Sequence, residues 1–508
     1  MHNNRDDIKI IAYYIGKIII GVGLLILIPI VTALIAGETV SIIDFSISFF
    51  VFMIIGLMLE QIGKGSKATF RWIHGLVISS LTWIVLMILA AIPYWLSGHF
   101  LSYLDAMFDV MSGFTTTGVV LIQDLDHASF SLNMWRHLLT FVGGQGMVVL
   151  ALSFIITKGA GSLCMYVGEA KDEKLLPNVT ETAKAIWIIS LVYLIVGTSI
   201  LTIVGIYIGL KPTTSFLHGL WIFMAAWSTG GFAPQSQNIV YYHSTLYETI
   251  TIIFFVIGSF NFALHHAVWK GNKKEIYKNI EMISFMSTLL ITTTLALRFF
   301  QKAGIYKDAL GMFRRVFYQI VSAHTTTGFM TLYSRQFLYD WGSIGIVIIS
   351  IAMLIGGSAS STAGGIKGIR VGFLFKGLLQ NMKKVASPEK RVYIEKYNFN
   401  GKNVLSDEMI RNALLIIVLY FMTFGIGVVA TLYCGYNLNE AIFESASITG
   451  NVGLTIGVTS ASMPDGLKIT YIIMMWLARL EFISAFAFMW TILNGVSKTC
   501  GKVFEKLA

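Results

Sequence analysis

The segment HTTTGF, residues 324–329, is unusual in so apolar a chain. Three consecutive threonines weaken a helix, because β-branched side chains lose rotamer freedom against the preceding turn. The glycine that follows favours backbone that is not helical. Long apolar stretches flank the segment on both sides, so it predicts an interruption between two membrane helices.

The composition is that of a membrane protein. Of the 508 residues, 55% are hydrophobic and 13% are charged, and the mean hydropathy is +0.72. A soluble domain carries about 25% charged residues. Apolar runs of roughly 20 residues, long enough to cross a bilayer, recur along the chain, and we expect an all-α polytopic protein with about ten spans in contact with membrane lipid. The N-terminus lacks a cleavage site, so the first helix should be retained.

The charge distribution predicts the orientation. Basic residues gather at 64–71, 270–278 and 376–411, whereas 98–130 contains no lysine or arginine. This positive-inside pattern places both termini and the basic loops in the cytoplasm, and it explains the net charge of +10 without nucleic acid as a partner. Three arginines fall on the outer side and do not fit: Arg314, Arg315 and Arg335.

One unit occurs four times. A long apolar helix is followed by a half-length amphipathic helix, at 103–114, 215–227, 311–324 and 438–448, and then by a short segment rich in threonine or glycine. These half-helices are too short to span and are typical of re-entrant segments. The segments read TTTGV (115–119), STGGF (228–232), TTTGF (325–329) and GNVGL (450–454), and the fourth residue of each is glycine.

Irregular backbone cannot face lipid, but it can line a water-filled path, where carbonyl oxygens replace the hydration shell of a cation. The negative ends of the half-helices would also favour a cation. The alternative is four ordinary turns at the membrane surface, which does not explain the common register. The predicted ion-binding residues are Thr115, Thr116, Thr117, Gly118, Ser228, Thr229, Gly230, Gly231, Thr325, Thr326, Thr327, Gly328, Gly450, Asn451, Val452 and Gly453.

On these motifs the chain resembles the Trk/Ktr/HKT superfamily of potassium transporters, and most of all the bacterial Trk membrane subunit. The segments FVGGQGMVVLA (141–151) and NFALHH (261–266) are also similar to family segments. The resemblance implies four pseudo-symmetric helix–pore-loop–helix repeats around one central pore, with two extra N-terminal helices. It also implies a homodimer on a cytosolic, nucleotide-binding ring of the RCK type.

The corresponding domain boundaries are 1–66 for the N-terminal pair, then 67–165, 175–275, 276–385 and 405–508 for the four repeats. Gly118 implies potassium, since some sodium-conducting relatives carry serine there. The segment GNVGL departs from the family pattern, because it lacks the threonines of the other three segments. The fourfold field around the ion is therefore expected to be uneven.

The segment IGGSASSTAGGIKG (355–368) interrupts the second long helix of the third unit. Its glycines and small polar residues make helix improbable, and it lacks the spacing of a phosphate loop. Small residues also serve close helix packing, but an unwound gate beneath the filter is the sharper interpretation, and the resemblance implies it. With Arg479 the predicted gate comprises Gly356, Gly357, Ser358, Ala359, Ser360, Ser361, Thr362, Ala363, Gly364, Gly365 and Lys367.

Arg479 is a charge deep in the last span, and such charges usually face a cavity or a partner. Its surroundings, LARLE, are similar to the family segment GRLE, which implies that it limits cation flow below the filter. A structural ion pair or a snorkelling side chain is the alternative, and Glu481 is on another helix face. Lys367 either pairs with an acid or reaches the cytoplasm.

Four acidic residues on or near the half-helices either concentrate cations at the mouth or only cap helix ends: Asp105, Asp109, Glu440 and Glu444. The predicted function is potassium uptake with K⁺ as the transported ion. The alternatives are a symporter of K⁺ with Na⁺ or H⁺, a poorly selective monovalent cation transporter, and the conducting subunit of a potassium-pumping ATPase. The chain lacks hydrolase and nucleotide-binding motifs, and its three cysteines are scattered, so we expect neither an enzyme nor an organic cofactor.

Overall fold

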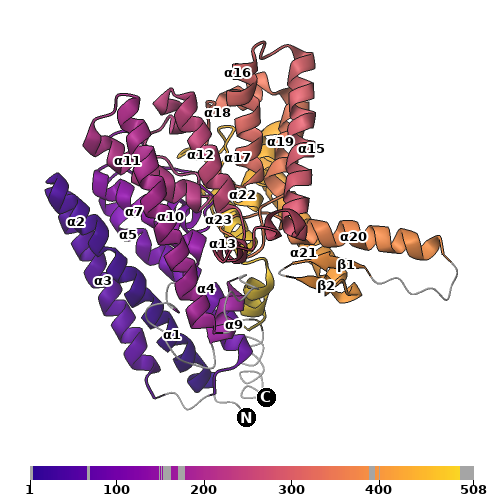
Figure 1. Cartoon of the computed structure of the whole chain (residues 1–508). Helices are drawn as coiled ribbons and strands as arrows, with labels where there is room; N and C mark the ends of the chain where they lie inside the picture. Colours follow the sequence, from indigo (N-terminus) through magenta and orange to yellow (C-terminus); the bar gives the residue numbers. More distant parts are fainter. Residues whose placement is uncertain are drawn as a thin grey trace.

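The computed structural model (Figure 1) describes residues 4–65, 69–147, 162–169, 178–387, 395–399 and 401–491, and single residues at 149, 152 and 493. The chain is almost entirely helical, as expected, with one small hairpin of β1 (Lys396–Asn398) and β2 (Lys402–Val404) in the described residues. Several sequence features lie outside them: Lys67, Lys390, Arg391, Cys500, part of 141–151 and the tail after residue 493.

Two apolar helical segments precede the repeats. The first consists of α1 (Asn4–Leu25) and α2 (Leu27–Ala36), and the second is α3 (Thr39–Gly63). They pack side by side along one edge of the molecule, drawn in indigo in Figure 1. Gly16 lies against the main chain of Gly56, where a Cβ would collide with the carbonyl oxygen. Small residues at such contacts let membrane helices approach closely.

The four units that follow share the order of long helix, half-helix and second helix. The first contains α4 (Trp72–Ala90), α5 (Ile92–Leu96), α6 (Tyr103–Phe114), α7 (Phe130–Gln145) and α9 (Ser162–Gly168). The second contains α10 (Val179–Tyr207), α11 (Pro212–Trp227), the 3₁₀ turn η1 (Asn238–Tyr242), α12 (Thr245–Gly258), α13 (Phe262–Trp269) and α14 (Glu275–Lys278).

The third unit contains α15 (Ile280–Ala303), α16 (Ala309–Met312), the π-helical turn η2 (Phe313–Phe317), α17 (Tyr318–His324), α18 (Ser334–Asp340), α19 (Gly342–Leu354) and α20 (Gly368–Val385). The fourth contains α21 (Asp407–Tyr433), α22 (Leu438–Gly450) and α23 (Asp465–Arg479). In Figure 1, α20 and the β1–β2 hairpin project from the side opposite α1–α3.

Six helical segments of the described chain are long and apolar enough to cross a membrane, and eight if each bent pair counts as one span. The number is below the ten expected because second helices are interrupted. The pair α12 and α13 bends by 98°, the pair of α23 and 483–491 bends by 115°, and α19 and α20 are separated by the predicted gate.

The second helices of the four units break at equivalent positions in the sequence. The helix caps at Gly146, Ser259, Ile355 and Leu480 all fall 27 or 28 positions after the glycine of the corresponding segment. The breaks are thus part of the fourfold repeat. In the third unit, the break is followed by the non-helical segment 355–367 before α20 begins at Gly368.

Arg314, which did not fit the topology, joins the second and third units. Its guanidinium forms a two-pronged ion pair with Glu248 of α12, with Nε–Oε2 and Nη2–Oε1 distances of 2.9 and 2.7 Å. Glu248 is fully buried. A buried carboxylate needs such a partner, since isolated burial of its charge is very costly.

Replacing Arg314 should destabilise the protein. Arg314→Ala leaves Glu248 buried without this counter-charge, and we expect a loss of about 3 kcal/mol, the low end for breaking a buried pair because the arginine is partly exposed. The measurement is the apparent melting temperature of purified protein in detergent. The neighbouring Arg315, whose guanidinium lies 6.0 Å from the ring centre of Tyr306, gives the control Arg315→Ala, and equal effects of the two variants would contradict the interpretation.

Candidate functional site

The four half-helices end in the same way. The residue two positions before each predicted filter glycine is left-handed, with φ between 50° and 55°: Thr116, Thr229, Thr326 and Asn451. In the first unit the N–H of Thr116 bonds to the Gly113 carbonyl at 3.0 Å, and the N–H of Thr117 bonds to the Ser112 carbonyl at 2.8 Å. The same pair of bonds recurs in the other three units. This is the Schellman motif, which satisfies the last carbonyls of a helix.

The helix therefore ends at a threonine or asparagine, and the predicted glycine has a second, separate role. A left-handed conformation costs roughly 1–2 kcal/mol in most residues, and asparagine tolerates it better than others. Asn451 occupies this position in the fourth segment. The unusual GNVGL sequence thus keeps the backbone geometry of its three counterparts, although its side chains differ.

The four glycines bring the segments into contact as a closed ring. Each has positive φ, from 62° to 93°. A Cβ at each would collide with a carbonyl oxygen of the next segment: Gly118 with Gly230, Gly231 with Thr327, Gly328 with Val452, and Gly453 with Thr117. The fourth segment therefore closes on the first. Positive φ and close backbone approach are the two conditions that require glycine.

Side-chain oxygens support the ring differently in different segments. The hydroxyls of Thr115 and Thr117 are 2.8 Å apart, as are those of Thr325 and Thr327 in the third segment. In the fourth segment, the Asn451 amide donates to the Thr117 hydroxyl at 2.9 Å. The asparagine therefore bonds directly between the fourth and first segments.

The predicted gate is a buried loop with a closed base. Ile355 and Ile366 form a parallel bridge, in which the Gly356 N–H bonds to the Ile366 carbonyl and the Ile366 N–H to the Leu354 carbonyl, each at 2.9 Å. The loop is anchored elsewhere by Glu281, whose carboxylate accepts the Ala359 N–H at 2.6 Å.

This loop contacts the left-handed residue of all four segments. Thr362 contacts the first two, through its carbonyl to the Thr116 hydroxyl at 3.5 Å and through its hydroxyl to that of Thr229 at 3.3 Å. Gly364 donates its N–H to the Thr326 hydroxyl at 2.7 Å. The same glycine lies against Asn451, leaving no room for a Cβ.

Arg479 lies beside this contact. It donates to the Thr362 carbonyl at 2.7 Å and to the Thr116 hydroxyl at 3.3 Å. It also donates to the carbonyls of Gly143 and Gly144, at 2.7 and 3.1 Å, at the end of α7. A helix C-terminus favours a cation. The hydrogen bonds of Arg479 go to neutral oxygens at the level of the ring, a geometry unlike both an ion pair and a snorkelling side chain.

Glu481 pairs with the base of the gate loop. Its carboxylate contacts the Arg370 guanidinium and lies 3.9 Å from the Lys367 ammonium. Of the two possibilities for Lys367, the structure thus shows pairing with an acid. The sequence did not reveal these buried pairs, because Arg370 and Glu481 are 111 positions apart and no local pattern relates them.

A cavity of about 140 Å³ lies on the other side of the ring. It is lined by Gly118, Gly231 and Gly453 and by residues that follow them. The four acids predicted near the mouth serve structural contacts: Asp105 pairs with Lys468 at 2.6 Å, Glu440 caps Asn437 at 2.9 Å, and Asp109 and Glu444 bind backbone N–H groups. Glu440 therefore caps a helix end, as one alternative predicted, whereas Asp105, Asp109 and Glu444 are buried in contacts within the protein.

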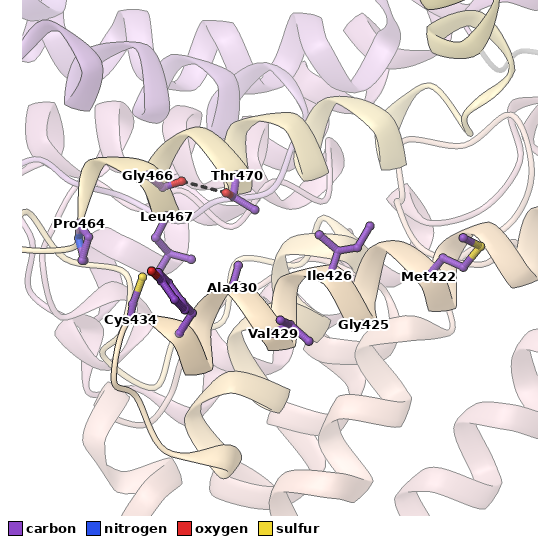
Figure 2. Close-up of a pocket in the computed structure, with 11 residues that line it drawn as sticks. Met422, Gly425, Ile426, Val429, Ala430, Cys434, Pro464, Gly466, Leu467 and Thr470 are labelled. Atoms are coloured by element: carbon purple, nitrogen blue, oxygen red, sulfur yellow. Dashed lines mark hydrogen bonds between the residues drawn. The ribbon is translucent and has the colours of Figure 1, made fainter.

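A second hollow is unrelated to the predicted residues. An apolar groove of about 940 Å³ lies between α21 and α23. Figure 2 shows side chains that line it, such as Met422, Ile426 and Leu467. Its Thr470 hydroxyl is already bonded to the Gly466 carbonyl at 2.8 Å. This lining suits contact with acyl chains and not with an ion.

A family model described as TrkH, cation transport protein, matches residues 41–302 and 307–494. The chain belongs to this family. An uncharacterized cation transporter of Methanocaldococcus jannaschii is 30% identical to it over 94% of both chains. The Trk system potassium uptake protein TrkG of Escherichia coli is 28% identical, covering 94% of this chain and 97% of its own.

The crystal structure of the potassium transporter TrkH from Vibrio parahaemolyticus has the same fold, with a TM-score of 0.79 and 25% identity over 96% of this chain and 98% of its own. These findings confirm the resemblance and the fourfold helical architecture drawn from the sequence. The relatives are named as transporters and not as enzymes, in agreement with the expectation.

Two glycines of the fourth unit provide a matched test of the ring. Gly453 and Gly457 both have positive φ, but only a Cβ on Gly453 meets the Thr117 carbonyl, while the nearest atom to one on Gly457 is 3.8 Å away. We expect Gly457→Ala to cost about 1 kcal/mol of stability from strain alone and to keep cation uptake, and Gly453→Ala to abolish uptake. Rubidium uptake into liposomes measures both, and equal uptake would contradict the ring geometry.

Proposed function

We propose that this protein takes up potassium across the cytoplasmic membrane through a pore with a four-segment filter and an intramembrane gate. The observation that carries the proposal is the ring: four buried chain breaks with one backbone conformation, closed through their glycines. Non-helical backbone at membrane depth is tolerated where it lines a path. The relatives named as potassium uptake proteins support K⁺ as the transported ion.

In this proposal the predicted residues at 115–118, 228–231, 325–328 and 450–453 hold dehydrated K⁺ with their carbonyl oxygens. Alternating left-handed residues at the first segment, Thr116 and Gly118, support this role, because they turn the backbone away from helical hydrogen bonding. Selectivity then depends on the number and position of the carbonyl dipoles.

The loop 355–367 is the proposed gate, since it contacts the ring from the side opposite the 140 Å³ cavity. Arg479 holds it closed by bonding to Thr362. We further propose a homodimer with cytoplasmic termini, divided into domains at the boundaries given above, with a cytosolic nucleotide-binding ring that releases the loop. The basic segment 376–402 is available to dock such a ring, through positive charge.

Gly118→Ser tests the filter. The serine Cβ would meet the Gly230 carbonyl and would require a φ of 92°, so the ring must open on one side. The measurement is ⁸⁶Rb⁺ uptake into proteoliposomes under a K⁺ gradient, with competing K⁺ or Na⁺. Competition by K⁺ alone in the wild type, and by both ions in the variant, is expected. Wild-type uptake that Na⁺ blocks equally well would remove the potassium assignment, and accumulation beyond about fiftyfold at 100 mV would favour a coupled symporter.

Removing residues 358–363 tests the gate. Because the Ile355–Ile366 bridge closes the base of the loop, Gly357 and Gly364 can be joined without moving the flanking helices. The shortened protein loses Thr362 and its contacts with the ring, so uptake should rise and should no longer need a cytosolic partner. Shortening an exposed surface loop elsewhere, 270–273, serves as the control. A shortened protein that folds and remains silent would contradict the gate.

A further inference from the structure

The chain that leaves the filter is tied back to its half-helix at equivalent positions. Nine residues before the filter glycine, a polar side chain reaches the third residue after it. In the first unit, Asp109 accepts the Leu121 N–H at 3.0 Å. In the fourth, Glu444 accepts the Ile456 N–H at 3.0 Å. In the third, the amide of Gln319 donates to the Thr331 hydroxyl at 2.8 Å.

Glu444 makes the most extensive of these contacts. Its Oε1 also accepts the N–H of Val458 at 3.1 Å and of Thr459 at 3.4 Å, and its Oε2 accepts the Thr459 hydroxyl at 3.1 Å. The Thr455 hydroxyl is a further donor. Glu444 is completely buried. A buried carboxylate within a membrane protein is costly unless its oxygens are bonded, and here one carboxylate orders the whole turn at 455–459.

The second unit lacks this contact between the half-helix and the chain that leaves the segment. The two equivalent positions are Ile222 and Pro234. Proline has no N–H to offer, and correspondingly the half-helix carries no acceptor. The first unit supplies the missing contact: Arg136 donates to the Ala233 carbonyl at 3.3 Å, and its guanidinium lies 4.7 Å from the ring centre of Phe232.

Arg136 itself is held by the first tether. Its Nε lies 3.8 Å from Asp109 Oδ2, and both side chains are fully buried. The exits of the first and second segments are therefore fixed together by one charged pair. The exits of the third and fourth segments are fixed separately by Gln319 and Glu444.

We propose that Asp109, Gln319 and Glu444, with Arg136 acting for the second unit, are positioning residues that set the ion preference of the filter from behind. The inference rests on the proposed function. Each tether fixes the chain three residues after a glycine whose backbone forms the ring, so it restricts how far that segment can move outward. A K⁺ site differs from a Na⁺ site in the size and flexibility of its ring of oxygens, and a looser ring should discriminate less.

Glu444 offers a clean test, because Glu440 on the same half-helix provides a matched control. Glu440 caps Asn437 at the start of α22, away from the ring. The variants are Glu444→Leu, Glu444→Gln and Glu440→Leu in the full chain. Gln319→Leu is added because it removes a neutral tether and leaves no charge unpaired, which protects the test if Glu444→Leu fails to fold.

The first measurement is the melting temperature of purified protein as K⁺ or Na⁺ replaces choline at constant ionic strength, since a bound ion stabilises the folded state by mass action. The second is ⁸⁶Rb⁺ uptake with K⁺ or Na⁺ as competitor. Glu444→Leu should reduce the K⁺/Na⁺ affinity ratio by about tenfold, equivalent to about 1.4 kcal/mol. Gln319→Leu should reduce it less, and Glu444→Gln, which keeps an oxygen acceptor, should restore most of it.

Glu440→Leu should lower the melting temperature without changing the K⁺/Na⁺ affinity ratio. This control separates an effect on the filter from a general loss of stability. A wild-type ratio in folded Glu444→Leu and Gln319→Leu would overturn this inference while leaving the proposed function intact. Wild-type protein without any preference for K⁺ would contradict the proposed function, and it would overturn this inference too, because no selectivity would remain for the tethers to support.

Discussion

Backbone polar groups that leave a helix at membrane depth must find partners within the protein, because lipid supplies none. This constraint governs the four chain breaks of the present structure. Each break ends its half-helix with two hydrogen bonds to the last turn, and each then passes its glycine against the main chain of the next segment. The remaining carbonyls are the groups that a dehydrated cation would satisfy. Packing, hydrogen bonding and the proposed transport therefore depend on the same few residues.

The four units share one backbone geometry, but they differ in the chain that follows the break in the second helix. All four second helices break at the same distance from the filter glycine, but the third carries the long loop that closes against the ring. One loop contacts four equivalent residues through different groups: the carbonyl and hydroxyl of Thr362, the N–H of Gly364, and the side of Gly364 that leaves no room for a Cβ beside Asn451. A single loop that contacts a fourfold ring needs no symmetry of its own.

The buried charged side chains lie where they restrain the main chain. Arg479 holds the loop 355–367 against the end of α7, Glu281 binds an N–H of the loop, and Glu444 orders the turn beyond the fourth segment. Each of these side chains bonds to backbone groups that have left regular structure. The free-energy cost of burying a charge in a membrane protein is thus offset where non-helical backbone needs a hydrogen-bond partner.

The sequence by itself determined the membrane class, the four half-helices, the register of the four segments and the position of the non-helical segment 355–367, because hydropathy, helix length and breaks such as HTTTGF are local properties. It did not identify the left-handed residue that ends each half-helix two positions before the glycine, Thr116 and its three equivalents. Only the tertiary structure decided the order in which the segments meet, the pairing of Arg370 with Glu481 and of Arg136 with Asp109, and the contacts of the half-helices with the chain that follows each glycine. Those contacts join residues that are distant in the chain, and a close approach or an ion pair exists only once packing has fixed where both partners lie.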